Sequence, residues 1–138
     1  MEKFKSFITE AKEDKYRILV ISSGALRSPN SEKAPIYHTA KRFQKEAEKV
    51  GHEVYVLQVE TAYITFENSI YKIFNKDDKE GFEINSENTV AIVRGTVRLK
   101  KSWLDLLSQL EKIGVCMVNS RETVELSADK YRTYLRLQ

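Results

Sequence analysis

Apolar residues along this chain gather in short uninterrupted runs that alternate with longer stretches of mixed polarity. The runs are Tyr16–Ile21, Val54–Leu57, Val90–Val93 and Val115–Val118. Runs of this length without alternating polar residues predict strands that are buried on both faces, which is typical of a parallel sheet. The sequence therefore predicts four core strands.

Between these runs, apolar residues recur every three or four positions, as they do on one face of a helix. One helix carries Ile36, Ala40, Phe43, Ala47 and Val50 and ends at Gly51, and another carries Trp103, Leu106, Leu107, Leu110 and Ile113. An amphipathic helix is also predicted over residues 2–13, from Phe4, Phe7, Ile8 and Ala11. The apolar stripe of this helix would cover the sheet or a partner subunit, so a homodimer is one expectation.

Residues 61–88 interrupt the alternation without a clean period of their own. Asn75–Gly81 carries a strong turn signal, with Ile73-Phe74 before it and Phe82 and Ile84 after it. We expect a β-hairpin or an irregular excursion here, between the second and third core strands. The remaining strands and helices alternate, which predicts an α/β fold with an open parallel sheet and helices on both faces.

Length and composition fit one soluble globular domain. The 138 residues can bury a sizeable core, and 41% hydrophobic with 31% charged residues is ordinary for such a domain. The net charge of +3 arises from 23 basic and 20 acidic residues. This even mixture argues against nucleic-acid binding, which requires basic residues clustered on one face. The basic run over residues 94–101 is then a solvated loop beside an anionic small molecule, or ordinary surface.

The single cysteine, Cys116, excludes an internal disulfide and suits a reducing compartment. Because Cys116 lies in an apolar run, we expect inert packing in the core rather than nucleophilic use. No apolar run approaches the length of a membrane span, and the amino terminus lacks the apolar segment of a signal peptide. The sequence predicts a cytoplasmic protein without a membrane partner.

In open parallel sheets, ligands bind beyond the carboxyl ends of the strands, near the point where the strand order reverses. We expect three segments to meet there, Ser22–Lys33, Arg94-Gly95 and Asn119–Arg121, with hydroxyl, amide and guanidinium groups suited to anionic oxygens. The candidate substrate contacts are Ser22, Ser23, Arg27, Ser28, Asn30, Arg94, Asn119 and Ser120. Arg27 and Arg94 can each hold a carboxylate through paired hydrogen bonds. The alternatives are a plain polar connector for the first loop and a structural salt bridge for Arg94.

Signatures of several other chemistries are missing from the sequence. It contains neither a Gly-x-x-x-x-Gly-Lys phosphate loop nor Gly-x-Gly-x-x-Gly. His38 and His52 flank one helix without a second ligand at metal spacing, and no Cys–His or Ser–His pair is evident. We therefore assign no catalytic residue and no metal ligand to this chain.

The segment from Ile113 to Leu137 carries the most specific pattern. Gly114 suits the end of a helix, and Asn119-Ser120 can turn the chain and cap the next helix, with Glu122 placed to help. Ala128-Asp129-Lys130 then opens a further helical run.

Two groups of spaced residues in this segment resemble the entry to the nucleotide-binding part of the ATP-grasp ligases. They are Gly-x-x-x-Val-Asn-Ser over residues 114–120 and Ala-Asp-Lys-x-x-Thr-x-x-x-Leu over residues 128–137. The nearest look-alikes are glutathione synthetase and the ribosomal-protein glutamate ligases. The resemblance implies a Rossmann-like pre-ATP-grasp domain over residues 1–126 and the start of a truncated nucleotide-binding domain over residues 127–138. It also implies that Lys130 contacts ATP phosphate, the alternative being an exposed helix lysine.

In this family, ATP phosphorylates a substrate carboxylate and an amine attacks the acyl phosphate, while Mg²⁺ bridges the phosphates. The resemblance thus implies the substrate-binding domain of a carboxylate–amine ligase, with ATP and Mg²⁺ as cofactors and small-molecule or peptide carboxylates and amines as substrates. The magnesium ligands would lie outside this chain, which alone would be inactive. Two alternatives stay open: a stand-alone binding or structural module without catalysis, and a flavodoxin-like cofactor binder.

Overall fold

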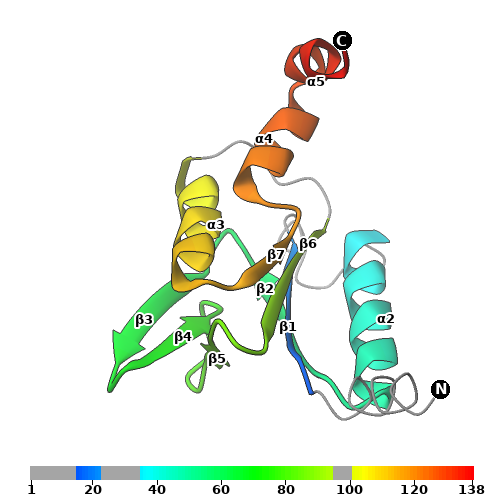
Figure 1. The fold of residues 1–138 in the computed structure, drawn as a ribbon. Helices are drawn as coiled ribbons and strands as arrows, with labels where there is room; N and C mark the ends of the chain where they lie inside the picture. Colours follow the sequence, from blue (N-terminus) through cyan, green and yellow to red (C-terminus); the bar gives the residue numbers. More distant parts are fainter. Residues whose placement is uncertain (1–14, 23–34, 95–100) are drawn as a thin grey trace, which may run out of the picture.

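The computed structural model describes residues 15–22, 35–94 and 101–138 of the chain (Figure 1). The strands are β1 (Arg17–Ser22), β2 (Glu53–Gln58), β3 (Tyr63–Glu67), β4 (Ile70–Phe74), β5 (Phe82–Ile84), β6 (Thr89–Arg94) and β7 (Cys116–Val118). The helices are α2 (Pro35–Lys49), α3 (Lys101–Ile113), α4 (Arg121–Ala128) and α5 (Lys130–Leu137). The helix predicted over residues 2–13 lies outside the described residues.

A parallel sheet holds the four predicted core strands in the order β2-β1-β6-β7. β1 pairs with both of its neighbours along its whole length, from Arg17 opposite Glu53 and Thr89 onward. The α/β class and the parallel sheet are therefore confirmed. In this order the chain moves from β1 to β2 in one direction, and later from β2 across to β6 in the other.

β1 is buried on both faces, as its unbroken apolar run predicts. Ile18 and Val20 join a small cluster with α2 that includes Ala47. Leu19 and Ile21, both fully buried, join a larger cluster with the apolar stripe of α3. Helices therefore cover both faces of the sheet (Figure 1).

Both covering helices are followed by a glycine in the left-handed conformation. Gly51 and Gly114 each have a φ of +91°, which suits the residue that ends a helix. The predicted stripe of α3 is buried up to Leu110, but the stripe predicted for α2 is only partly so. Phe43 is 38% exposed and Val50 is 69% exposed. The prediction is wrong for Val50 because this residue lies beyond the last turn of α2.

β7 corrects two predictions. It is an edge strand of three residues, with Cys116 exposed and Val118 46% exposed. The expectation of a strand buried on both faces is wrong here, and so is the expectation that Cys116 packs in the core. Cys116 and Val118 are exposed because β7 pairs with β6 on one side and with no described strand on the other. Val115, just before β7, is the buried residue of this run.

The insertion between β2 and β6 is a three-stranded antiparallel sheet in the order β3-β4-β5. The predicted hairpin is confirmed: the turn at Asn75–Gly81 joins β4 to β5, and Ile73 pairs with Phe82. A second hairpin, which was not predicted, turns at Asn68-Ser69 between β3 and β4. Both turn residues have a positive φ, 52° and 64°, as a two-residue type I′ turn requires.

Asn75 fastens this insertion to the outer edge of β2. Its side chain accepts a hydrogen bond from the Gln58 N–H at 2.8 Å and donates one to the Val56 carbonyl at 3.0 Å. An additional parallel strand would bind these same two backbone groups, so a single amide side chain satisfies the sheet edge at this point.

Tyr55 makes a second attachment to the insertion. Its hydroxyl donates to Asp78 Oδ2 at 2.5 Å and accepts from the Asn75 N–H at 3.0 Å. Asp78 Oδ1 in turn accepts from the N–H groups of Glu80 and Gly81. Burial and then the bond to Asp78 raise the pKa of Tyr55 to about 12. The Tyr55 hydroxyl and the two backbone N–H groups hold the pKa of Asp78 below its usual value.

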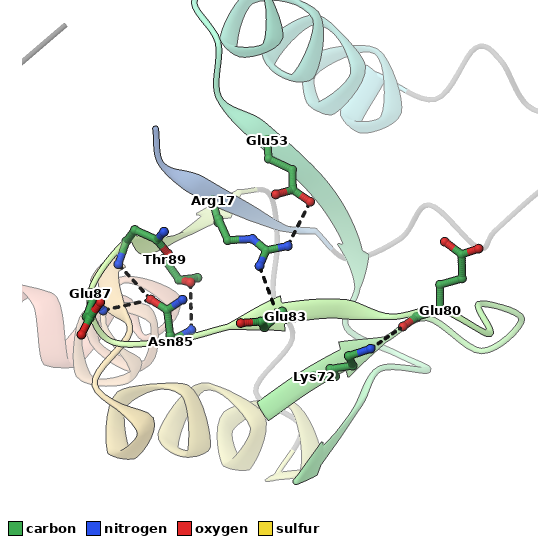
Figure 2. Close-up of polar contacts among 9 residues, drawn as sticks. Arg17, Glu53, Lys72, Glu80, Glu83, Asn85, Glu87 and Thr89 are labelled. Carbon is green, nitrogen blue, oxygen red and sulfur yellow. Dashed lines mark hydrogen bonds and ion pairs between the residues drawn. The ribbon is translucent and has the colours of Figure 1, made fainter. Parts of the chain in front are cut away.

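At the amino ends of the strands, Arg17 links the parallel sheet to the insertion (Figure 2). Its guanidinium lies 3.0 Å from the Glu53 carboxylate of β2 and 3.7 Å from that of Glu83 of β5. It also lies 4.8 Å from the centre of the Phe82 ring, on which Tyr55 stacks with ring centres 5.1 Å apart. These contacts connect the amino ends of β1 and β2 to the insertion.

Replacing Tyr55 with Phe is expected to lower the free energy of unfolding by about 1–2 kcal/mol near neutral pH, because a hydrogen bond to a carboxylate is lost. Because folding lowers the pKa of Asp78, the contribution of its carboxylate to the free energy of unfolding is present above about pH 4. This contribution is lost as the pH falls through the folded pKa. Because folding raises the pKa of Tyr55, the contribution of its protonated hydroxyl to the free energy of unfolding is present below about pH 10. This contribution is lost as the pH rises towards 12.

Urea unfolding of the wild type and of Tyr55→Phe at about pH 3, 7 and 11 measures this effect. Tyr131→Phe is the matched control, because Tyr131 is 70% exposed. The difference between wild type and Tyr55→Phe should be largest at pH 7, and a difference that is the same at all three values would contradict the assignment.

Candidate functional site

The carboxyl ends of β1, β2 and β6 lie side by side. Ser22, the last residue of β1, pairs with Gln58 on one side and with Arg94 on the other. β1 and β6 flank the point at which the strand order reverses, which is where open parallel sheets bind ligands. The backbones of Ser22 and Arg94 therefore meet at the edge where a ligand is expected.

Asn119 brings the end of β7 to this same edge. Its side-chain Nδ2 donates a hydrogen bond of 3.2 Å to the carbonyl of Val93, the residue before Arg94. Its φ of 69° lies in the left-handed region, which Asn tolerates better than most residues because its short polar side chain can bond locally. Asn119 is exposed, so its remaining amide proton and its carbonyl oxygen face solvent or a ligand.

Ser22 is buried, with 1% of its surface exposed. Its carbonyl accepts a hydrogen bond from the Val59 N–H at 3.2 Å, and the neighbouring Gln58 N–H is bound by Asn75. The Ser22 carbonyl and the Gln58 N–H, at the ends of β1 and β2, are therefore already hydrogen-bonded. Outside the described residues are Ser23, Arg27, Ser28, Asn30 and the side chain of Arg94.

Ser120 caps α4 as predicted, with its Oγ accepting a hydrogen bond from the Thr123 N–H at 3.3 Å. Glu122 lies in the first turn of α4, where a carboxylate is favourable, but it is not placed to make the reciprocal bond of a capping box. Thr123 occupies the third helical position, from which a side chain can reach back to the cap, and Glu122 pairs with Arg136 at 3.3 Å instead. The Ser120 hydroxyl is therefore engaged in orienting the first turn of α4.

Arg121 connects the start of α4 to α3 through hydrogen bonds. Its N–H donates to the Glu111 carboxylate at 2.7 Å, and its guanidinium donates to the Ser108 hydroxyl at 2.7 Å. The same guanidinium lies 3.4 Å from the carboxylate of Glu125. We expected this guanidinium to bind anionic oxygens at the sheet edge. It holds α4 against α3 instead.

Lys130 lies apart from the residues at the sheet edge. It is the first residue of α5, which Asp129 caps by accepting hydrogen bonds from the N–H groups of Tyr131 and Arg132. Its side chain is exposed, and α5 extends beyond α4, away from the sheet (Figure 1). The phosphate contact stays a prediction, as does the domain boundary between residues 126 and 127, which falls inside α4.

A depression of about 420 Å³ lies beside β7, and Glu111, Ser120 and Glu122 are part of its lining. The Glu111 carboxylate accepts from the Arg121 N–H, and the Glu122 carboxylate pairs with Arg136. Within residues 15–22, 35–94 and 101–138, no group of His, Cys, Asp and Glu side chains is arranged to hold a metal ion. In the same ranges, no helix has the length and apolar character needed to cross a membrane.

A comparison of the chain with known protein families finds no match, and a comparison with curated proteins also finds none. Any function must therefore be argued from the residues and from their arrangement at the sheet edge.

Two residues that shape this edge were not predicted from the sequence. Asn75 lies in a recognised turn signal, but nothing in the sequence indicates that its side chain binds β2, 17 residues before it. Val93 contributes a carbonyl, which carries no sequence signal at all. Asn119 itself was predicted from its position directly after an apolar run.

The two roles of Asn119, its left-handed backbone and its bond to Val93, can be separated by mutation. Asn119→Gly keeps the backbone conformation and loses the hydrogen bond, so we expect a loss of about 0.5–1 kcal/mol in the free energy of unfolding. Asn119→Ala loses both, so we expect about 1–2 kcal/mol. Urea unfolding gives the two values, and an Ala variant as stable as the Gly variant would contradict the left-handed backbone at this position.

Proposed function

We propose that this chain is the substrate-binding domain of an ATP-dependent carboxylate–amine ligase of the ATP-grasp type. Its Rossmann-like domain holds the substrate carboxylate at the carboxyl edge of the parallel sheet, and Lys130 contacts ATP phosphate. A nucleotide-binding domain, in the same polypeptide or in a partner, supplies the remaining contacts to ATP and Mg²⁺.

The observation that carries the proposal is the meeting of β1, β6 and β7 at one edge. Ser22 stands opposite Arg94 where the strand order reverses, and Asn119 binds the carbonyl that precedes Arg94. Asn119 also belongs to the residues that resemble the ATP-grasp ligases. The resembling segment starts at Gly114 before β7, reaches the ligand edge at Asn119 and continues through α4 to Lys130, which supports a shared role for the two regions.

A carboxylate is the ligand that best suits the groups at this edge. The guanidinium of Arg94 can bind both oxygens of a carboxylate through parallel hydrogen bonds. The Asn119 amide has a second N–H to donate, since its bond to Val93 uses one of two. The Ser22 carbonyl and the Gln58 N–H are already hydrogen-bonded, so they do not compete with these groups for the ligand.

The described residues do not make a nucleotide site by themselves. Lys130 is a single exposed cation, and no acidic group in the described ranges is arranged for Mg²⁺. When bound by the complete enzyme, ATP supplies the phosphoryl group that activates the carboxylate. The part of this chain is to bind the carboxylate and to hold it in one orientation, which is where much of the rate enhancement of such reactions arises.

Titration of ¹⁵N-labelled protein with L-glutamate, and with its diamide as a ligand lacking carboxylates, tests the site. We expect glutamate to shift the backbone amide signals of Ser22, Arg94, Asn119 and Ser120, and the diamide to leave them in place. Arg94→Ala should weaken glutamate binding at least about tenfold, because charge-assisted hydrogen bonds worth about 1.5–3 kcal/mol are lost.

Arg42→Ala is the matched control, because Arg42 is an exposed residue of α2, and it should leave glutamate binding unchanged. Shifts confined to another surface, or an equal loss in both variants, would contradict the proposed edge. In a protein or complex that contains the nucleotide-binding domain, Arg94→Ala and Lys130→Ala should each reduce carboxylate-dependent phosphate release. ATP turnover that needs no carboxylate would rule out the ligase.

A further inference from the structure

β3 forms an open edge of the antiparallel sheet. It is the first strand in the order β3-β4-β5, so no strand of the described chain pairs with its outer side. It lies at the margin of the molecule (Figure 1). Two large apolar residues of β3 are exposed, Phe66 by 58% and Tyr63 by 46%, and Ile70 at the start of β4 is 40% exposed. Proteins commonly protect such edges with Pro, Lys or a covering side chain, as Asn75 does at β2, but β3 contains neither Pro nor Lys.

The hairpin geometry determines which backbone groups face this open edge. With a two-residue turn at Asn68-Ser69, the flanking residues Glu67 and Ile70 exchange hydrogen bonds, and bonded pairs then alternate along the two strands. Ile64 and Phe66 lie between the bonded positions of β3. Their N–H and C=O groups therefore point away from β4, towards the open edge.

This edge is complementary to a second copy of itself. When two β3 strands run antiparallel about a two-fold axis at Thr65, Ile64 of one copy lies opposite Phe66 of the other. The outward N–H and C=O groups of both residues are then paired, and the exposed Phe66 side chain of each copy covers the partly buried Ile64 side chain of the other. Tyr63 lies opposite Glu67, and Thr65 faces its own counterpart in a favourable cross-strand pair.

The outer face of the sheet suits the same register. A hollow of about 470 Å³ on this face is lined in part by Tyr63, Phe74 and Lys72, and the two rings stack with centres 5.0 Å apart. In the paired arrangement, Glu67 of the second copy extends the row of Tyr63 and Phe74, with Lys72 in the next row. The Tyr63 hydroxyl can then donate to this carboxylate, whereas the Lys72 ammonium donates to the Glu80 carbonyl at 3.5 Å.

We infer that two copies of this chain pair through β3 about a two-fold axis at Thr65, joining their antiparallel sheets into one sheet of six strands. The contact involves one five-residue strand from each copy, which is small beside the roughly 1,200 Å² or more that stable complexes bury. The dimer is therefore weak and forms in a concentration-dependent way. It is independent of the proposed ligase function and of any dimer through residues 2–13.

Sedimentation velocity of the full 138-residue chain between about 10 μM and 1 mM measures this association. We expect the dimer fraction to rise with concentration, and Thr65→Glu to raise the dimer dissociation constant at least about fivefold, because like charges then face each other across the axis. The new carboxylate also faces Lys72 within its own hairpin, which favours folding. Thr123→Glu, on the exposed surface of α4, is the matched control and should leave the dimer unchanged.

Disulfide formation in a Cys116→Ser background tests the register. Thr65→Cys places two Cα atoms about 4.5 Å apart across the axis, within the range of a disulfide, so air oxidation should link the copies. Glu67→Cys places them about 14 Å apart, so it should not link.

Three results would overturn the inference: a wild-type chain that stays monomeric at 1 mM, a dimer insensitive to Thr65→Glu, and equal linking by the two cysteine variants. A monomer would mean that another segment or partner covers β3, and an insensitive dimer would mean that a different surface pairs.

Discussion

The burial of β1 on both faces is the constraint on which the rest of this structure depends. Ile18 and Val20 are buried against α2, whereas Leu19 and Ile21 are buried in the cluster that contains α3 and the insertion. A strand hidden in this way needs a covering layer on each face and a paired strand on each side, because its backbone groups have no access to water. β2 and β6 supply the paired strands, and the helices with the antiparallel sheet supply the layers.

The fold was largely predictable because strands buried on both faces have unbroken apolar runs. The same reasoning misjudged β7, since a run of apolar residues does not reveal that its strand lies at the edge of the sheet. The insertion was harder to predict for a different reason. Its inner face carries Ile64 and Ile73, but its outer face carries the stacked Tyr63 and Phe74, so apolar residues occur on both faces and the period of two is obscured.

The candidate site was predictable in its location and not in its contacts. Parallel strands bring their carboxyl ends to one edge, so the approach of Ser22 to Arg94 follows from the strand pattern. The bond from Asn119 to Val93 joins residues 26 apart in the sequence, and the roles of Asn75 and Arg121 depend on packing between elements. Such contacts leave no periodic signal.

Amide hydrogen exchange of the ¹⁵N-labelled protein tests the central position of β1 most directly. The amides of Leu19, Val20 and Ile21 should be among the slowest to exchange, with an opening free energy equal to the free energy of unfolding measured in urea. The amides of β7 should open at a lower free energy, because this strand has one paired neighbour. If the β1 amides exchanged as fast as those of β7, well below the global value, β1 would not be the buried centre on which the sheet is built.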